Sequence, residues 1–136
     1  PMQLQYQRSK DRIYAMNDAC DVVMDFECRH DFFEGFNSEG LERETLPNGL
    51  YPHAWAEITN GKYGRSYGTF YITTGDPRGR DIHGGGDGYG IRDPYAPRQG
   101  WLPTYGCLRM QNEDGEALSR WMIENGNDML LEVVDE

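Results

Sequence analysis

The sequence contains no long apolar run and no cluster of basic residues. Its 136 residues include 13 Lys and Arg against 23 Asp and Glu, which gives a formal net charge of −10. Nucleic acids and anionic membranes bind basic surfaces, so we expect neither as a partner. No stretch is long and apolar enough for a membrane span or a signal peptide. If Pro1 is left from a tag and Met2 is the native start, the protein is made without an ordinary export signal; the alternative is that a signal segment was removed.

Cysteine is scarce, and its count of three is odd, so at least one thiol is left over from any intramolecular pairing. Cys20 and Cys28 would lie roughly 25 Å apart if the chain between them is one extended strand, so we expect no disulfide. There is no Cys-x-x-Cys pair, and the three His are scattered at His30, His53 and His83. A protein zinc site needs clustered ligands, so we expect no metal and no cofactor.

Glycine, proline and tyrosine are abundant instead. The chain has 17 Gly, 7 Pro and 9 Tyr, a composition typical of many turns joined by aromatic-rich strands. Hydrophobic residues make up 38% of the chain, enough for one real core at this length. We therefore predict a single, mainly β domain over residues 1–136, in which a β-meander of about residues 2–30 packs on the rest.

Local patterns indicate where the elements lie. The expected strands are at residues 3–7, 12–16, 22–28, 50–58, 69–73, 81–83 and 129–134. Pro52 lacks a backbone N–H, so it should confine its strand to an edge or an end of a sheet. Asn112 is expected to cap a helix that Asn125-Gly126 ends. Residues 31–44 are acidic and contain Gly, which predicts a long loop.

The residues with the clearest chemistry lie between His83 and Cys107, which are 24 positions apart (107 − 83). They can meet only if the intervening chain folds back. Seven Gly and three Pro from Gly84 to Gly106 make this easy. A thiol beside an imidazole is a common way to make a sulfur nucleophile, because an ion pair between them raises the thiolate fraction. We therefore predict a Cys–His pair.

His83-Gly84, followed after a loop by Thr-Tyr-Gly-Cys-Leu-Arg-Met at 104–110, resembles the L,D-transpeptidase (YkuD-like) catalytic domain. The turn Leu-Pro-Asn-Gly-Leu-Tyr at 46–51 and the closing helix and strand resemble the same family. The resemblance spans roughly residues 40–134. It implies a mainly β fold, an L,D-transpeptidase-like β-sandwich with one short helix after the catalytic Cys segment.

By this resemblance Cys107 is the nucleophile, His83 is its base, and the Gly84 carbonyl orients the imidazole. Backbone N–H groups around Tyr105, Gly106 and Cys107 would form an oxyanion hole, a site that needs donors fixed in advance.

Three more residues complete the predicted site. Thr104 belongs to the same turn. Arg109 either supports the loop or holds a substrate carboxylate, since a guanidinium suits carboxylates. Trp101, in the loop before the Cys, is a candidate lining residue of the pocket. The sequence departs from the family at Tyr105, where a second His is usual, and in a longer gap between His83 and Thr104.

The resemblance implies a cysteine-dependent enzyme that acts on peptidoglycan stem tetrapeptides ending in D-Ala. It would release D-Ala through a thioester and act as an L,D-carboxypeptidase, a D-amino-acid exchange enzyme or an L,D-transpeptidase in the periplasm or cell wall. Two alternatives stay open. Tyr105 is compatible with a non-catalytic cell-wall-binding module that kept the fold, and the Cys–His pair with a cysteine hydrolase on an unrelated substrate.

The missing export signal suggests a further expectation. A wall enzyme without a leader would need a specialised secretion route, which would make it an antibacterial effector with a secretion-system or immunity protein as partner. A leader encoded upstream would instead make it a housekeeping enzyme.

Overall fold

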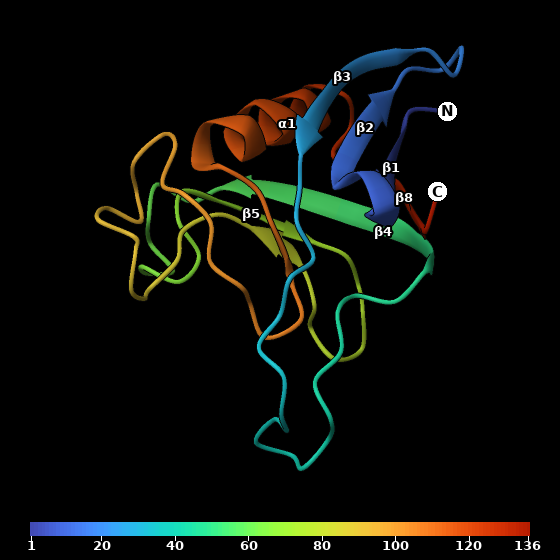
Figure 1. Cartoon of the computed structure of the whole chain (residues 1–136). Coiled ribbons are helices and arrows are strands. Elements are labelled where there is room, and N and C mark those ends of the chain that lie inside the picture. Colours follow the sequence, from blue (N-terminus) through green and yellow to red (C-terminus); the bar gives the residue numbers. More distant parts are fainter.

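A three-stranded meander begins the chain in the computed structural model, which describes residues 1–136 (Figure 1). It comprises β1 (Gln3–Gln7), the short 3-10 turn η1 (Arg8–Lys10), β2 (Arg12–Met16) and β3 (Val22–Glu27). Both neighbouring pairs of strands are antiparallel. Leu4, Tyr6 and Ile13 alternate with more exposed residues and are fully buried, so the period-two pattern that predicted these strands also fixes their inner face.

The last strand joins the meander to the rest of the sheet. β8 (Met129–Val134) runs parallel to β1 on one side and antiparallel to β4 (Gly49–Ile58) on the other. Beyond β4 follow β5 (Phe70–Thr73), β6 (Ile82–His83) and β7 (Leu108–Arg109). The eight strands form one curled sheet in the order β3-β2-β1-β8-β4-β5-β6-β7. The predicted mainly β fold is confirmed.

Pro52 was expected at an edge or an end, and this prediction is wrong. β4 lies between β8 and β5 in the middle of the sheet, with Pro52 inside it. The pairing of β4 with β8 shifts between Tyr51 and Ala54, so Pro52 lies at an irregularity of the ladder. β5 pairs only with Trp55–Ile58, so Pro52 has a neighbouring strand on one side only, and the irregularity on that side leaves a residue unpaired. A residue without an N–H therefore fits here.

The single helix, α1 (Asn112–Glu124), packs on β4 and β5. Gly115 lies against the ring of Phe70, and a Cβ there would come within 1.9 Å of a ring carbon, so the helix approaches β5 closely only because this residue is Gly. Leu118 and Met122 fill the core on the same side. The helix has 13 residues and is not long and apolar enough to cross a membrane.

Asn112 is not the N-cap that its sequence position suggested. Gln111 occupies that position, and the buried Asn112 amide serves the loops instead. Its oxygen accepts the N–H groups of Thr69 (3.2 Å) and Gly85 (3.2 Å). Its nitrogen donates to carbonyls of the 84–106 segment, at Pro94 and Ala96. One side chain therefore ties the glycine-rich segment to the start of the helix and to the loop before β5.

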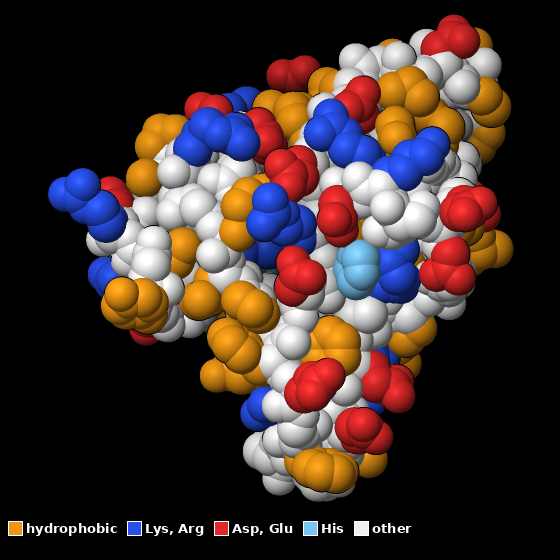
Figure 2. Space-filling view, in the orientation of Figure 1, with side chains coloured by type: hydrophobic (Ala, Val, Ile, Leu, Met, Phe, Trp, Pro, Cys, Tyr) orange, Lys and Arg blue, Asp and Glu red, His pale blue; other side chains and the backbone are white.

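The predicted loop at 31–44 contains no strand or helix and projects from the sheet (Figure 1). Its base runs beside the Cys segment: the Phe33 N–H donates to the Thr104 carbonyl (2.8 Å), and the Leu46 N–H donates to the Gly106 carbonyl (2.9 Å). The chain at both ends of the loop therefore holds the Cys segment in place through hydrogen bonds. Acidic and basic side chains are interspersed over the face shown in Figure 2, without one continuous basic patch.

Candidate active site

Strand register explains why distant residues meet on one face of the sheet. A row of directly paired residues crosses four strands: Glu57 on β4, Tyr71 on β5, His83 on β6 and Arg109 on β7. The neighbouring row, one residue along each strand, is buried on the core side and comprises Ala56, Ile72, Ile82 and Leu108. Side chains alternate along a strand, so Cys107, two residues before Arg109, shares the outer face with His83.

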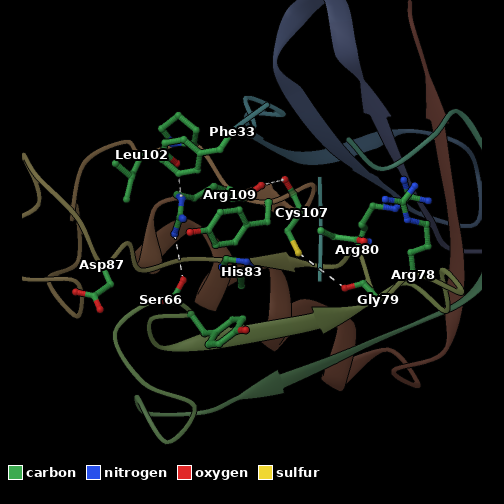
Figure 3. A pocket seen from close by; sticks show the side chains of 15 residues that line it. Phe33, Ser66, Arg78, Gly79, Arg80, His83, Asp87, Leu102, Cys107 and Arg109 are labelled. Atoms are coloured by element: carbon green, nitrogen blue, oxygen red, sulfur yellow. Dashed lines mark hydrogen bonds between the residues drawn. The ribbon is translucent and has the colours of Figure 1, made fainter. Parts of the chain in front are cut away.

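His83 and Cys107 line one pocket of about 350 Å³ (Figure 3). Around them lie Phe33, Asn37, Ser66, Tyr67, Arg78, Gly79, Arg80, Asp87, Leu102, Pro103, Thr104, Tyr105 and Arg109. The 84–106 segment folds back as the Gly and Pro content predicted, and it brings the two residues to the same cavity.

The His83 imidazole is fixed by its neighbours and is neutral. Nδ1 lies 2.9 Å from the Gly84 carbonyl, which can only accept, so Nδ1 carries the proton and Nε2 is left as the basic nitrogen. The ring stacks on Tyr71 at an interplanar angle of 11° and meets the edge of Tyr67. Burial, helped by the nearby Arg109 charge, lowers the pKa of His83 to about 3.

The Cys107 sulfur is held beside the start of β6. Sγ accepts the Asp81 N–H at 3.3 Å and faces the Gly79 carbonyl at 3.9 Å. Burial raises the pKa of the Cys107 thiol to about 11, and the Asp81 N–H only partly offsets this.

The expected thiolate–imidazolium pair is therefore not the resting state. Thiol and imidazole are both neutral at pH 7, and no hydrogen bond joins Sγ to His83. Desolvation explains the difference, because charging both largely buried groups costs more than their attraction returns. Catalytic hydrogen bonds are often long without substrate, so the arrangement remains chemically competent.

This electrostatic state predicts how Cys107 reacts with iodoacetamide. Because only the thiolate is nucleophilic and the pKa is raised, the alkylation rate should increase about tenfold for each pH unit between about pH 7 and pH 10. Peptide mapping after timed labelling measures it, with the exposed Cys20 as internal reference. A Cys107 rate that levels off below pH 8 contradicts the neutral resting thiol.

The turn before Cys107 shows which backbone donors are free. The Thr104 hydroxyl donates to the Cys107 carbonyl (2.7 Å) and accepts the Gly106 N–H (3.1 Å). This changes the predicted oxyanion hole, because the Gly106 amide is already engaged. The amides of Tyr105 and Cys107 donate to no group of the chain. Gly106 has φ 133°, and a Cβ there would meet the Glu44 carbonyl oxygen at 2.6 Å, so this turn requires Gly.

Comparison with solved structures shows the fold. The structure of Bdellovibrio bacteriovorus Bd1075 superposes with a TM-score of 0.63 at 12% identity, over 99% of this chain and 48% of that one. An L,D-transpeptidase from Xylanimonas cellulosilytica superposes with a TM-score of 0.56 at 16% identity, over 98% and 60%. This chain has an L,D-transpeptidase-like fold. No family model and no curated protein matches its sequence.

The chain spans about half the length of the Bd1075 structure and 60% of the L,D-transpeptidase structure. At these identities the likeness shows the fold alone, and the roles of individual residues rest on the geometry of the pocket.

Two of the predicted site residues, Arg109 and Trp101, contact other parts of this chain. Arg109 donates from Nε to the Leu102 carbonyl (2.8 Å) and from Nη1 to the carbonyls of Ser66 (3.3 Å) and Gly84. It therefore supports the loops, the first of its two expected roles. Trp101 does not line the pocket, and that prediction is wrong: its ring stacks under the Arg29 guanidinium, 4.1 Å from the centroid.

Asp81 and Arg78 also belong to the site, although neither was predicted from the sequence. Asp81 places its N–H on the Cys107 sulfur, and its carboxylate accepts the Tyr71 hydroxyl (2.6 Å). Alternation along the short strand would have found it, because Asp81 lies two residues before His83 and so shares its face. Arg78 lies on the exposed turn before β6, and no local pattern marks it as a pocket residue.

Tyr105 stands where the L,D-transpeptidase motif that this sequence resembles has a second His, and its phenol makes no hydrogen bond. The side chain is 70% exposed and lies between Phe33 and the Arg43 guanidinium. If the pocket has the cysteine-dependent activity that the resemblance implies, Tyr105→Phe should keep its rate within about threefold, whereas losing an oxyanion donor costs about 10²–10³. Gly106→Ala, which distorts the turn, is the contrasting variant and should lose far more. A hundredfold loss in Tyr105→Phe would show that the hydroxyl takes part.

Proposed function

We propose that this protein is a cysteine-dependent enzyme that modifies peptidoglycan stem tetrapeptides through a thioester on Cys107 and so acts at the cell wall. One observation carries the proposal: the His83 imidazole on β6 and the Cys107 thiol, directly before the parallel strand β7, share a pocket in an L,D-transpeptidase-like fold.

The first half-reaction begins from neutral groups. His83 Nε2 takes the Sγ proton while Sγ attacks the carbonyl carbon of the amide that precedes D-Ala, so the thiolate need not accumulate beforehand. The carbonyl oxygen becomes an oxyanion, which the amides of Tyr105 and Cys107 stabilise. The imidazolium then gives its proton to the leaving amine, the C–N bond breaks, and D-Ala departs from a thioester.

The second half-reaction reverses the proton path. Water, or the amine of another molecule, attacks the thioester carbonyl and gives a proton to His83 Nε2. The C–S bond breaks, and the proton returns to the sulfur. Water yields a tripeptide, a free D-amino acid yields an exchanged tetrapeptide, and a second stem yields a cross-link.

The charge of the pocket supports an anionic substrate. The chain carries −10 overall, yet the pocket contains Arg78, Arg80 and Arg109 against one carboxylate, Asp87. Asp76 neutralises Arg80 in a buried pair at 2.8 Å. The exposed Arg78 uses one nitrogen on the Glu42 carbonyl (3.0 Å), which leaves donors for a carboxylate of the stem peptide.

Product analysis tests the proposal. We expect purified disaccharide-tetrapeptide to give mainly tripeptide, or exchanged tetrapeptide when free D-amino acid is present, because transfer to a second stem needs a site that keeps water out. Chromatography with mass spectrometry separates these products from 3–3 linked dimers. Dominant dimers contradict the expected product ratio, and absence of D-Ala release contradicts the proposed function.

A second candidate is the non-catalytic wall-binding module. The neutral thiol and the missing hydrogen bond between Sγ and His83 favour it. Such a module would bind insoluble peptidoglycan equally well with Cys107 or Ala at this position and would release no D-Ala from either.

A further inference from the structure

A second hollow lies on the same face of the sheet as His83. It has a volume of about 440 Å³ and is lined by Trp55, Glu57, Tyr63, Tyr67, Tyr71 and Thr73, here called the aromatic groove. Its floor comes from paired residues of β4 and β5, Trp55 with Thr73 and Glu57 with Tyr71. Trp55 and Tyr63 are each 47% exposed and Tyr67 38%, so three large aromatic side chains are left open around one hollow.

The aromatic groove is continuous with the candidate active site. Tyr67 lines both cavities. The rings of Tyr67 and Tyr71 lie 4.9 Å and 6.0 Å from the His83 ring, between centroids. Cys107, where the substrate carbonyl is attacked, directly precedes β7. β5 is two strands and β4 three strands away from β7, so the groove begins about 10 Å from the Cys107 position and ends about 14 Å from it.

The charges in the groove argue against a cationic ligand. The Glu57 carboxylate already accepts the Tyr63 hydroxyl (2.8 Å) and pairs with Lys62. The Lys62 ammonium also lies 5.2 Å from the centroid of the Tyr63 ring, so the groove already holds a cation against its one carboxylate and one of its rings. Meanwhile the indole N–H of Trp55 and the hydroxyl of Tyr67 have no partner within the chain. The groove therefore offers flat apolar faces and a few neutral polar groups.

We infer that the aromatic groove binds a pyranose ring of the glycan to which the stem peptide is attached. A pyranose presents C–H groups on one face, which pack on aromatic rings, and hydroxyl groups at its edge, which suit the free donors. The inference rests on the proposed function. Three residues separate the reacting carbonyl from the sugar in a stem peptide, a span of about 10 Å when extended, which reaches from Cys107 to the near side of the groove at Tyr71.

Kinetics with two substrates tests the subsite. We expect the original protein to have a kcat/KM about tenfold higher for disaccharide-tetrapeptide than for the sugar-free tetrapeptide. That ratio should fall to about one in Trp55→Ala and in Tyr63→Ala. Leu50→Ala, which removes an exposed apolar side chain from the same strand, should keep the ratio. Equal kcat/KM values in the original protein overturn the inference and leave the proposed function standing.

A binding measurement tests the sugar subsite independently of the proposed enzyme activity. Triacetylchitotriose titrated into Cys107→Ala, followed by tryptophan fluorescence and calorimetry, needs no catalysis. We expect millimolar binding that Trp55→Ala abolishes and Leu50→Ala keeps, even if D-Ala release is never found. Absence of binding overturns the inference. A Trp55-dependent dimer, seen by size-exclusion chromatography and unable to bind the sugar, also overturns it.

Discussion

Cys107→Ala should lower the rate of D-Ala release by about 10⁴-fold or more, because removing a covalent nucleophile removes the whole thioester route. The measurement is the initial rate of D-Ala release from purified tetrapeptide muropeptide. The variant should fold normally, since Cys107 is not part of the buried hydrophobic cluster.

The other two cysteines provide matched controls. Cys20 is exposed at the turn between β2 and β3, and Cys20→Ala should keep full activity. Cys28 is fully buried in the core, so Cys28→Ala should lower the melting temperature and still turn over. Activity in Cys107→Ala equal to that of Cys20→Ala would overturn the nucleophile assignment.

His83→Ala should lower the same rate by about 10²–10⁴-fold, the usual contribution of a positioned general base. Without the imidazole the thiol must ionise by itself. Because the pKa of Cys107 is raised to about 11, the residual rate should then increase with pH over the whole range from pH 6 to pH 10.

The original protein should have a pH profile that lacks this increase. The pKa of His83 is lowered to about 3, so the base is already unprotonated well above that pH and is lost only as pH falls toward it. The thiol keeps its proton until pH rises toward about 11. kcat/KM reports the free enzyme, so it should be flat from about pH 5 to pH 9. A bell-shaped profile with a limb near pH 6.5 would contradict the neutral pair.

Seven of the eight strands and the helix could be predicted from the sequence because their signals are local, whereas the two-residue strand β7 was missed. Alternation placed the meander and β8, and the run of glycines and prolines identified the segment that folds back over the sheet. Pro52 was misplaced because a bulge depends on the partner strand and not on the residue itself. Asn112 was misplaced for a similar reason: its capping preference yields to four hydrogen bonds with loops distant in sequence.

Some features of the candidate site could likewise be predicted from the sequence, and others could not. The order of His83 and Cys107 along the chain was sufficient to propose the pair. Their protonation states were not predictable, because burial decides them and burial follows from tertiary packing. Register decides the rest: Glu57, Tyr71 and His83 form a row only because three strands align, and nothing in any one strand indicates it.

Mass spectrometry of the acyl-enzyme tests the central claim most directly. Tetrapeptide muropeptide is mixed with the protein, quenched in acid at short times and digested. We predict a transient adduct on the Cys107 peptide with the mass of the donor minus D-Ala, removable by hydroxylamine and absent in Cys107→Ala. Release of D-Ala without such an adduct, or with an adduct on Cys20 or Cys28, would contradict the account.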